Sequence, residues 1–198
     1  MCAARISAAD AWTDADAGWE RLQLAAAEAF AAGDLVGAVA TWAAALRTAR
    51  ASFEADDPRL ATSLANYATA LQQKGDPVPA RLWQEALEVL DAAPAWLARQ
   101  RFVRGARSSM FHLRLEAKHP GAYDVNLRRR GETLLRAARA AVAKLAAGAS
   151  GQPPDHAALQ ALRGARYDAM RKVLAAAHLL LAPAPGQKVQ LQPAQEDS

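Results

Sequence analysis

The sequence predicts an all-α protein built from antiparallel helix pairs, and three observations support this fold class. Apolar residues make up 52% of the 198 positions and aromatic residues only 6%, and most of the apolar residues are alanine, which has the highest intrinsic helix propensity. Apolar residues also recur three and four positions apart, which is the spacing of one helix face. Finally, a Gly-Asp turn occurs at Gly33-Asp34 and again, 42 residues later, at Gly75-Asp76. A repeat of this length is typical of helical arrays.

The first helix pair is predicted over residues 19–53. Residues 1–18 are expected to form a flexible lead, and the apolar spacing over 19–32 predicts the first helix. Gly33 permits the left-handed conformation that ends a helix. Asp34 can then cap the second helix by accepting hydrogen bonds from its free backbone N–H groups.

A second helix pair is predicted up to Leu90. Asp57 and Pro58 indicate its start, because aspartate is favoured near a helix N-terminus and proline in the first helical turn. Gly75 ends this helix as Gly33 ends the first one. The helix after it carries apolar residues with helical spacing as far as Leu90.

Residues 91–147 are predicted to form a third, degenerate and basic helix pair. Asp91 and Pro94 indicate a helix start, and His119-Pro120-Gly121 indicates a stop. The second helix of this pair is predicted from Ala122 to Ala147. The remaining chain divides into a linker at 148–154, a capping helix at 155–182 and a disordered tail at 183–198.

The two N-terminal pairs share an ordered set of small and apolar residues. The first copy reads Leu22-x3-Ala26-x6-Gly33-Asp34-x3-Ala38-x3-Trp42-x2-Ala45, and the second repeats its first half as Leu64-x3-Ala68-x6-Gly75-Asp76. This order resembles the tetratricopeptide repeat, and the run from Asp57-Pro58 to Tyr67-Ala68 looks like the longer repeat of kinesin light chains. The resemblance covers about residues 19–90. It implies antiparallel pairs in a right-handed superhelical array. Together with the elements predicted after Leu90, the whole chain is expected to contain about seven helices.

One departure from the repeat is visible at the second turn. Ala38 precedes Trp42 by four positions, whereas Ala80 precedes Trp83 by three. If these residues are equivalent, the second turn has lost a residue or is tighter than the first.

In the resembling family, the first helices of successive repeats line a groove that receives an extended peptide or a helix. Asn66 falls where kinesin-light-chain-type repeats place an asparagine facing this groove, and an amide can both donate to and accept from a ligand backbone. The resemblance implies that the groove also contains Gln23, Thr62, Thr69 and Gln73, with Glu20 and Ala27 beside them. The alternative is that Asn66 is an ordinary solvated residue.

Charge is segregated along the chain. Residues 1–98 carry a net charge of −6, residues 99–172 carry +11, and residues 173–198 carry −1.

The predicted basic face contains Arg101, Arg104, Arg107, Arg114, Arg128, Arg129 and Arg130. Such a face attracts acidic proteins, nucleic acids, anionic membranes or the acidic half of a second copy. Because the sequence has no nucleic-acid motif, an acidic protein partner or a solvated surface is favoured over RNA or DNA. The three consecutive arginines point in different directions on a helix and cannot form one patch alone.

The sequence offers little support for catalysis or a cofactor. His112, Glu116 and His119 share one helix face, and Glu116-x-x-His119 matches half of a di-iron motif, but the second half is missing. There is no phosphate-binding loop or nucleophile elbow. The single cysteine, Cys2, indicates a reducing compartment. The apolar run at 173–182 is too short to span a membrane.

The expected function is that of a non-enzymatic adaptor or assembly factor in the cytoplasm. It would bind a segment of a protein partner, a peptide or a helix, through the groove and the basic face, without a cofactor or a membrane. The basic face favours an acidic partner. The alternative is a helical component of an RNA–protein particle. A more remote alternative is a metal-binding helical enzyme.

Overall fold

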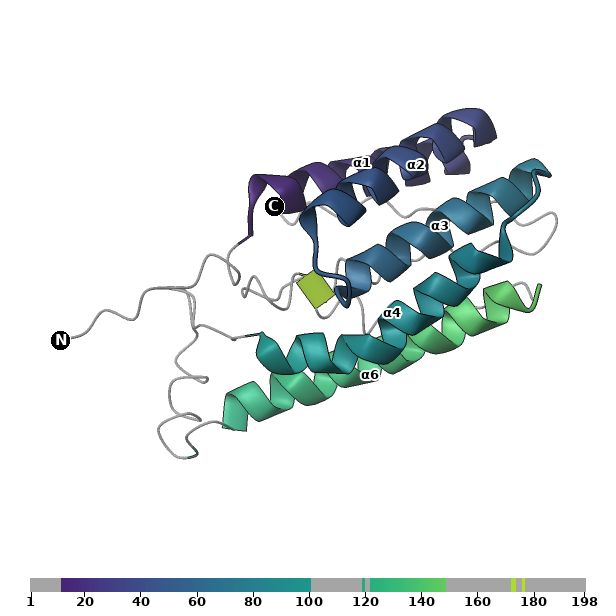
Figure 1. The fold of residues 1–198 in the computed structure, drawn as a ribbon. Helices are drawn as coiled ribbons and strands as arrows, with labels where there is room; N and C mark the ends of the chain where they lie inside the picture. The colour runs from purple at the N-terminus through teal and green to yellow at the C-terminus, as the bar shows by residue number, and fades with distance from the viewer. Residues whose placement is uncertain (1–11, 101–118, 120–121, 149–171, 174–175, 177–198) are drawn as a thin grey trace.

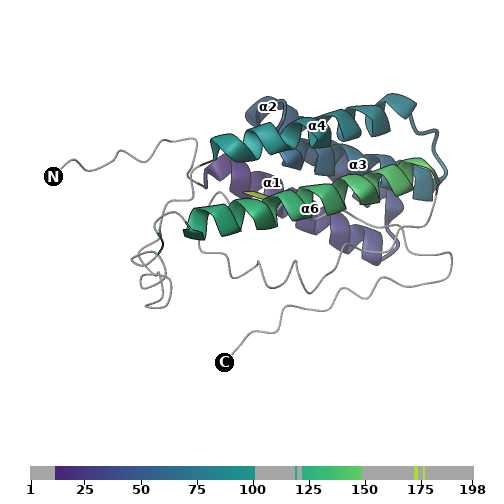
Figure 2. The same cartoon turned by 90° about the horizontal axis from the view of Figure 1, so that it is seen from below.

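A computed structural model describes residues 12–100, 119, 122–148, 172–173 and 176. These residues contain no strand and form five helices: α1 (Asp14–Ala31), α2 (Leu35–Ser52), α3 (Pro58–Lys74), α4 (Ala80–Arg99) and α6 (Ala122–Ala146). The all-α prediction is therefore confirmed. Each described helix packs against the next one in chain order (Figure 1). In Figure 2, which views the molecule from below, α6 lies nearest the viewer.

The first helix begins earlier than predicted. The Thr13 hydroxyl accepts a hydrogen bond from the backbone N–H of Asp16, and the Asp16 carboxylate accepts one from the backbone N–H of Thr13 at 2.6 Å. This reciprocal capping box stabilises a helix start at Asp14, five residues before Trp19. Residues 14–18 therefore belong to α1, and residues 1–11 of the predicted lead lie outside the described residues.

The predicted turn residues are confirmed at the C-terminal ends of α1 and α3 and at the N-terminal ends of α2 and α3. Gly33 and Gly75 both adopt positive φ, at 83° and 86°. Asp34 caps α2 by accepting a hydrogen bond from the backbone N–H of Gly37 at 2.8 Å. Asp57 caps α3 in the same way, with Pro58 in the first helical turn.

The second turn is longer than the first, so the prediction of a lost residue is wrong. Residues 32–34 join α1 to α2, whereas residues 75–79 join α3 to α4. The buried positions of α2 are Ala38, Trp42, Ala45, Leu46 and Ala49, and those of α4 recur 44 residues later as Leu82, Ala86, Val89, Leu90 and Ala93. Ala86, and not the partly exposed Trp83, is therefore the equivalent of Trp42. Pro77 and Pro79 account for the longer connection, because they have no N–H to continue a helix.

The helix start predicted at Asp91 and Pro94 is not present. Helix α4 continues through both residues to Arg99. Pro94 removes one backbone hydrogen bond, but buried side chains on both sides of it, Leu90 and Trp96 among them, keep one continuous apolar face. The boundary predicted between residues 90 and 91 therefore falls inside a helix.

The C-terminal half is described in part. Helix α6 matches the helix predicted over 122–147 to within one residue. Residues 101–118 and the tail at 183–198 lie outside the described residues, and the predicted capping helix is described only at Lys172, Val173 and Ala176. These three residues are buried. None of the described helices is long and apolar enough to cross a lipid bilayer.

Candidate functional site on the polar face of helix α3

Helix α3 carries most of its polar side chains on one face, and that face is largely buried. The residues concerned are Arg59, Thr62, Ser63, Asn66, Thr69 and Gln73, which follow one another at spacings of three and four, apart from the adjacent pair Thr62 and Ser63. All of them except Gln73 are at most 2% exposed. Buried polar groups persist in a fold only when they have hydrogen-bond partners. We call this set of six residues the α3 polar face.

Gln23 of α1 links three helices at the centre of this face. Its Oε1 accepts hydrogen bonds from Trp42 Nε1 and Asn66 Nδ2, both at 2.9 Å. Its Nε2 donates to Ser63 Oγ at 3.3 Å. Ser63 Oγ also accepts a hydrogen bond from Trp19 Nε1 at 2.8 Å. Two predicted groove residues, Gln23 and Asn66, are thus in direct contact with each other.

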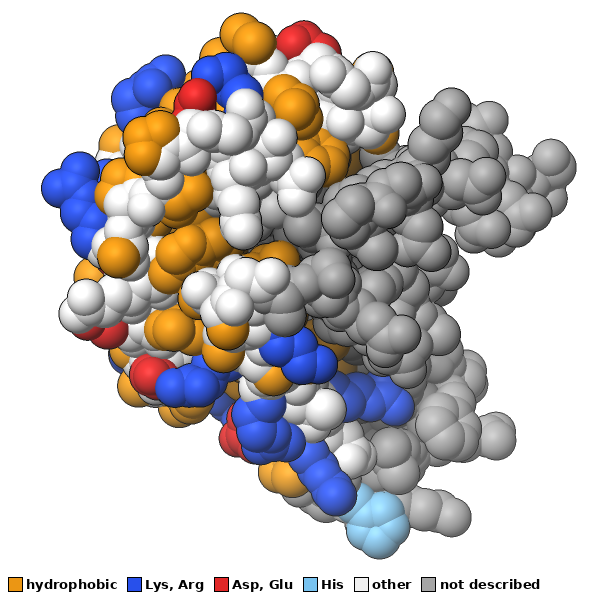
Figure 3. Space-filling model, turned by 90° about the vertical axis from the view of Figure 1, so that its right-hand side faces the viewer, with side chains coloured by type: hydrophobic (Ala, Val, Ile, Leu, Met, Phe, Trp, Pro, Cys, Tyr) orange, Lys and Arg blue, Asp and Glu red, His pale blue; other side chains and the backbone are white. Residues whose placement is uncertain are grey.

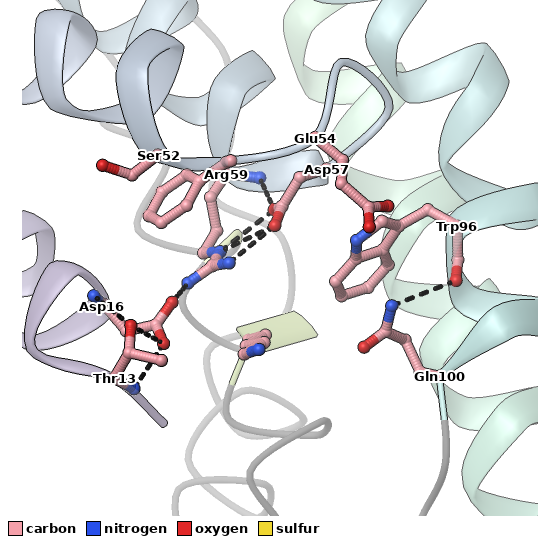
Figure 4. A pocket seen from close by; sticks show the side chains of 10 residues that line it. Thr13, Asp16, Ser52, Glu54, Asp57, Arg59, Trp96 and Gln100 are labelled. Carbon is pink, nitrogen blue, oxygen red and sulfur yellow. Dashed lines mark hydrogen bonds and ion pairs between the residues drawn. The ribbon is translucent and has the colours of Figure 1, made fainter. Parts of the chain in front are cut away.

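A buried ionic cluster lies at the N-terminal end of the same face (Figure 4). The Arg59 guanidinium donates to Asp57 Oδ2 at 2.6 Å and to Asp57 Oδ1 at 3.0 Å, and its Nη1 is paired with Asp16. The guanidinium carbon also lies 3.6 Å from the centre of the Phe53 ring. Arg59 therefore joins α1, α3 and the loop between α2 and α3.

Asp16 and Arg59 stabilise each other's charged forms. Burial by itself raises the pKa of Asp16, but hydrogen bonds from Arg59 and from the Thr13 backbone outweigh this effect and hold the pKa below its ordinary value. Burial lowers the pKa of Arg59, but the hydrogen bonds and charge of Asp57, together with those of Asp16, raise it above its ordinary value. A carboxylate with a lowered pKa is poorly suited to proton transfer near pH 7. Asp16 is instead suited to holding Arg59 in place.

A cavity of about 190 Å³ opens beside the ionic cluster. Besides Asp16, Asp57 and Arg59, its lining includes Trp96 and Gln100 from the end of α4 (Figure 4). Lys172 also lines it. No protein-family model, curated protein or solved structure matches this chain.

Near the C-terminus, the described residue Ala176 contacts the α3 polar face. Thr62 Oγ1 donates a hydrogen bond to the backbone carbonyl of Ala176 at 2.6 Å. Val173 is 1% exposed and belongs to the main hydrophobic core. The described residues of the predicted capping helix thus pack against α3 and the cavity at its N-terminal end.

The predicted groove residues fall into two groups. Gln23, Thr62, Asn66 and Thr69 are buried and hydrogen-bonded within the chain, so the alternative of Asn66 as a solvated residue is wrong. Gln73 is exposed, at the C-terminal end of the same face. Binding of a partner by these residues stays a prediction.

The predicted basic face is described at three of its seven residues. Arg128 donates hydrogen bonds to the backbone carbonyls of Leu97, Ala98 and Gln100 at 2.7–2.9 Å, at the C-terminal end of α4. Arg129 and Arg130 are exposed. The remaining residues, Arg101, Arg104, Arg107 and Arg114, lie outside the described residues. Arg128 therefore has a structural role that the sequence pattern did not indicate.

The metal hypothesis depends on residues that are mostly outside the described part of the chain. His112 and Glu116 are not described, although His119 is. Within the ranges that the structure covers, no group of three or more His, Cys, Asp or Glu side chains could hold a metal ion.

Sequence reasoning missed Asp16, Arg59 and Ser63. One usable signal was position, because Arg59 and Ser63 lie seven and three residues before Asn66 and so share its helix face. The other was the Thr13-x-x-Asp16 spacing of a capping box. The pairing of Asp16 with Arg59 had no signal in the sequence, since it joins residues 43 positions apart.

Proposed function

We propose that this protein is a non-enzymatic adaptor or assembly factor that holds a polypeptide segment of a protein partner against the α3 polar face. The observation that supports this most is the hydrogen bond from Thr62 to the carbonyl of Ala176, 114 residues later in the chain. It involves the backbone of the bound segment and not its side chain. Hydrogen bonds to a backbone give affinity with little dependence on sequence. The same face is therefore suited to a segment from another protein.

A tetratricopeptide-like superhelix of about seven helices is part of this proposal. Consecutive packing of α1, α2, α3 and α4 supports it, as does the recurrence of the buried positions of α2 in α4. In such an array α1 and α3 line the inner face, which agrees with the contacts of Gln23 with Asn66 and Ser63. The cytoplasmic location and the absence of a cofactor expected from the sequence belong to the same proposal.

The most direct test uses two neighbouring glutamines of α3. Both Gln72 and Gln73 are exposed, but only Gln73 continues the α3 polar face. Gln73→Arg should reduce the yield of a protein that co-purifies with the tagged chain from its own cells, while Gln72→Arg should leave the yield unchanged. The proposal fails if the two variants recover the same proteins in the same amounts as the wild type.

We propose a second surface on α6, the basic stripe of Arg129, Arg136 and Lys144. All three are exposed and lie on the side of α6 opposite its buried residues Leu135, Ala138 and Val142. The part of the molecule at the level of α6 carries a group of Lys and Arg side chains (Figure 3). The exposed Glu132 lies between Arg129 and Arg136 on this side, but the three cations outnumber it, and a net positive side favours an acidic protein surface.

The stripe is tested by reversing its charge. Arg129→Glu with Arg136→Glu should abolish binding of an acidic partner, whereas Arg21→Glu with Arg47→Glu, two exposed arginines of α1 and α2, should not. If the stripe instead binds RNA, affinity for a random single-stranded RNA should fall steeply as salt rises. That result would favour the RNA–protein particle as the function.

A further inference from the structure

We infer that the segment containing Lys172, Val173 and Ala176 is a resident ligand of the α3 polar face, and that an external partner binds there by displacing it. The statement about displacement rests on the proposed function. The statement about the resident ligand rests on the chain's own contacts.

Three contacts, one from each described residue, hold the segment. Ala176 offers its carbonyl to Thr62, at 2.6 Å. Val173 is almost completely buried in the main core. Lys172 is 6% exposed and lines the cavity beside the ionic cluster. A polar, an apolar and a basic group of one short segment thus each meet a complementary environment.

Electrostatics explains why a basic residue belongs at this end. The ionic cluster contains two carboxylates, Asp16 and Asp57, and one guanidinium, Arg59, so that its net charge is −1. Glu54 also lines the cavity and is paired with Arg99, but Arg99 is paired with Asp56 too, so these three residues add a further net charge of −1. Lys172 lines the same cavity, so a basic residue stands in the wall of a cavity that is lined by an excess of negative charge.

The spacing of the segment defines the partner that would replace it. The backbone N–H of Ala176 donates to the carbonyl of Lys172 at 3.2 Å, which is the pattern of a helical turn. Val173 and Ala176 are three positions apart and so share one side of that turn. The α3 polar face therefore fits a helical segment with a basic residue immediately before an apolar residue, and a small residue three positions after the apolar one.

An intramolecular ligand lowers the apparent affinity of any competitor. A tethered segment acts at an effective concentration in the millimolar range. A partner binds only the fraction of molecules in which the segment has left, so its apparent dissociation constant rises in inverse proportion to that fraction. Weakening the resident segment should therefore strengthen binding in trans.

The test supplies the segment as a labelled synthetic peptide of residues 168–180. Fluorescence anisotropy should show that the peptide binds full-length Val173→Asp at least ten times more tightly than it binds the full-length wild type. A peptide with the same substitution should bind neither protein. Equal binding of the unmodified peptide to both proteins would overturn the inference, and so would binding to neither when the variant retains the helical circular dichroism of the wild type.

A second measurement decides the matter if Val173→Asp does not fold. Thr62→Val removes the donor to Ala176 and keeps the β-branched shape. It should speed tryptic cleavage after Lys172 about fivefold, the value of one ordinary hydrogen bond when cleavage follows the open population. Thr69→Val is the matched control, because the Thr69 hydroxyl bonds only the carbonyl of Ala65 in its own helix, at 2.8 Å. Equal cleavage rates in these two variants contradict the inference.

These experiments separate the inference from the proposed function, because they use no external protein. If the peptide binds as expected while Gln73→Arg changes no co-purifying protein, the adaptor function fails and the resident segment stands. If Gln73→Arg abolishes a complex while the peptide and cleavage results are negative, the adaptor function stands and the resident segment fails.

Discussion

Replacing Gln23 with leucine tests whether the buried polar network stabilises the arrangement of the first three helices. Leucine replaces the amide with an apolar branched group and leaves Trp42 Nε1 and Asn66 Nδ2 without the acceptor that they share at 2.9 Å. Each buried donor without an acceptor costs about 1–3 kcal/mol, and the added apolar side chain returns about 1 kcal/mol. We expect Gln23→Leu to lower the free energy of unfolding by about 3 kcal/mol.

Urea unfolding followed by tryptophan fluorescence measures this change, with Gln84→Leu on the exposed surface of α4 as the control. The control should change stability by less than about 0.5 kcal/mol. Combining Gln23→Leu with Asn66→Leu should cost less than the sum of the two single changes, because each one removes the partner that the other leaves unsatisfied. The reasoning is refuted if Gln23→Leu costs no more than Gln84→Leu, or if the double variant is strictly additive.

Three further predictions concern ionisation, helix ends and close packing. Because the pKa of Asp16 is lowered in the folded protein, its contribution to stability is present above the unfolded pKa and is lost as pH falls through the folded one. Asp16→Asn should therefore flatten the dependence of stability on pH below about pH 5, and an unchanged slope would contradict this. Arg128→Met should lower the free energy of unfolding in urea by about 2 kcal/mol, because it removes charged donors to three carbonyls. Arg129→Met should leave this free energy almost unchanged, and similar losses in both variants would contradict the structural role of Arg128. Gly18→Ala, whose added carbon would make only an ordinary contact with the Arg21 side chain at 3.9 Å, should raise the melting temperature through a gain of about 1 kcal/mol. Gly131→Ala, whose added carbon would lie 2.9 Å from the side chain of Leu97, should not, and an equal gain in both would contradict the close packing of α4 and α6.

The parts of the fold that could be predicted are those fixed by local chemistry. Gly33 and Gly75 end helices because they adopt positive φ easily, and Asp34 and Asp57 cap the following helices with their own carboxylates. The 42-residue interval between the two turns is read directly from the sequence, and it indicated the repeated helix pairs without any knowledge of tertiary contacts.

The errors arose where tertiary packing overrides local signals. Pro94 normally indicates a helix boundary, but the buried face of α4 extends across it and keeps the helix continuous. Trp83 was matched to Trp42 by residue type, although burial assigns that position to Ala86. A sequence pattern cannot distinguish these cases because it does not contain the neighbouring helix.

The predicted site was partly accessible to the same reasoning. Helical spacing put Thr62, Asn66 and Thr69 on one face of one helix. The family resemblance put Gln23 on the face of another helix that meets it, and the structure confirms the contact between Gln23 and Asn66. The occupation of that surface by the C-terminal segment could not be predicted. It depends on the contact between Thr62 and Ala176, which are far apart in the sequence and carry no shared pattern.

Site-specific photo-crosslinking tests the central claim, that the α3 polar face binds a protein partner, most directly. A photoreactive phenylalanine analogue placed at Gln73 should give, in living cells, a covalent adduct with one partner protein, and the same group at Gln72 should not, since both positions are exposed but only Gln73 extends the face. Peptide mapping of the adduct should find a helical segment with a basic residue before an apolar one. The absence of an adduct at Gln73, or equal adducts at both positions, would contradict the account.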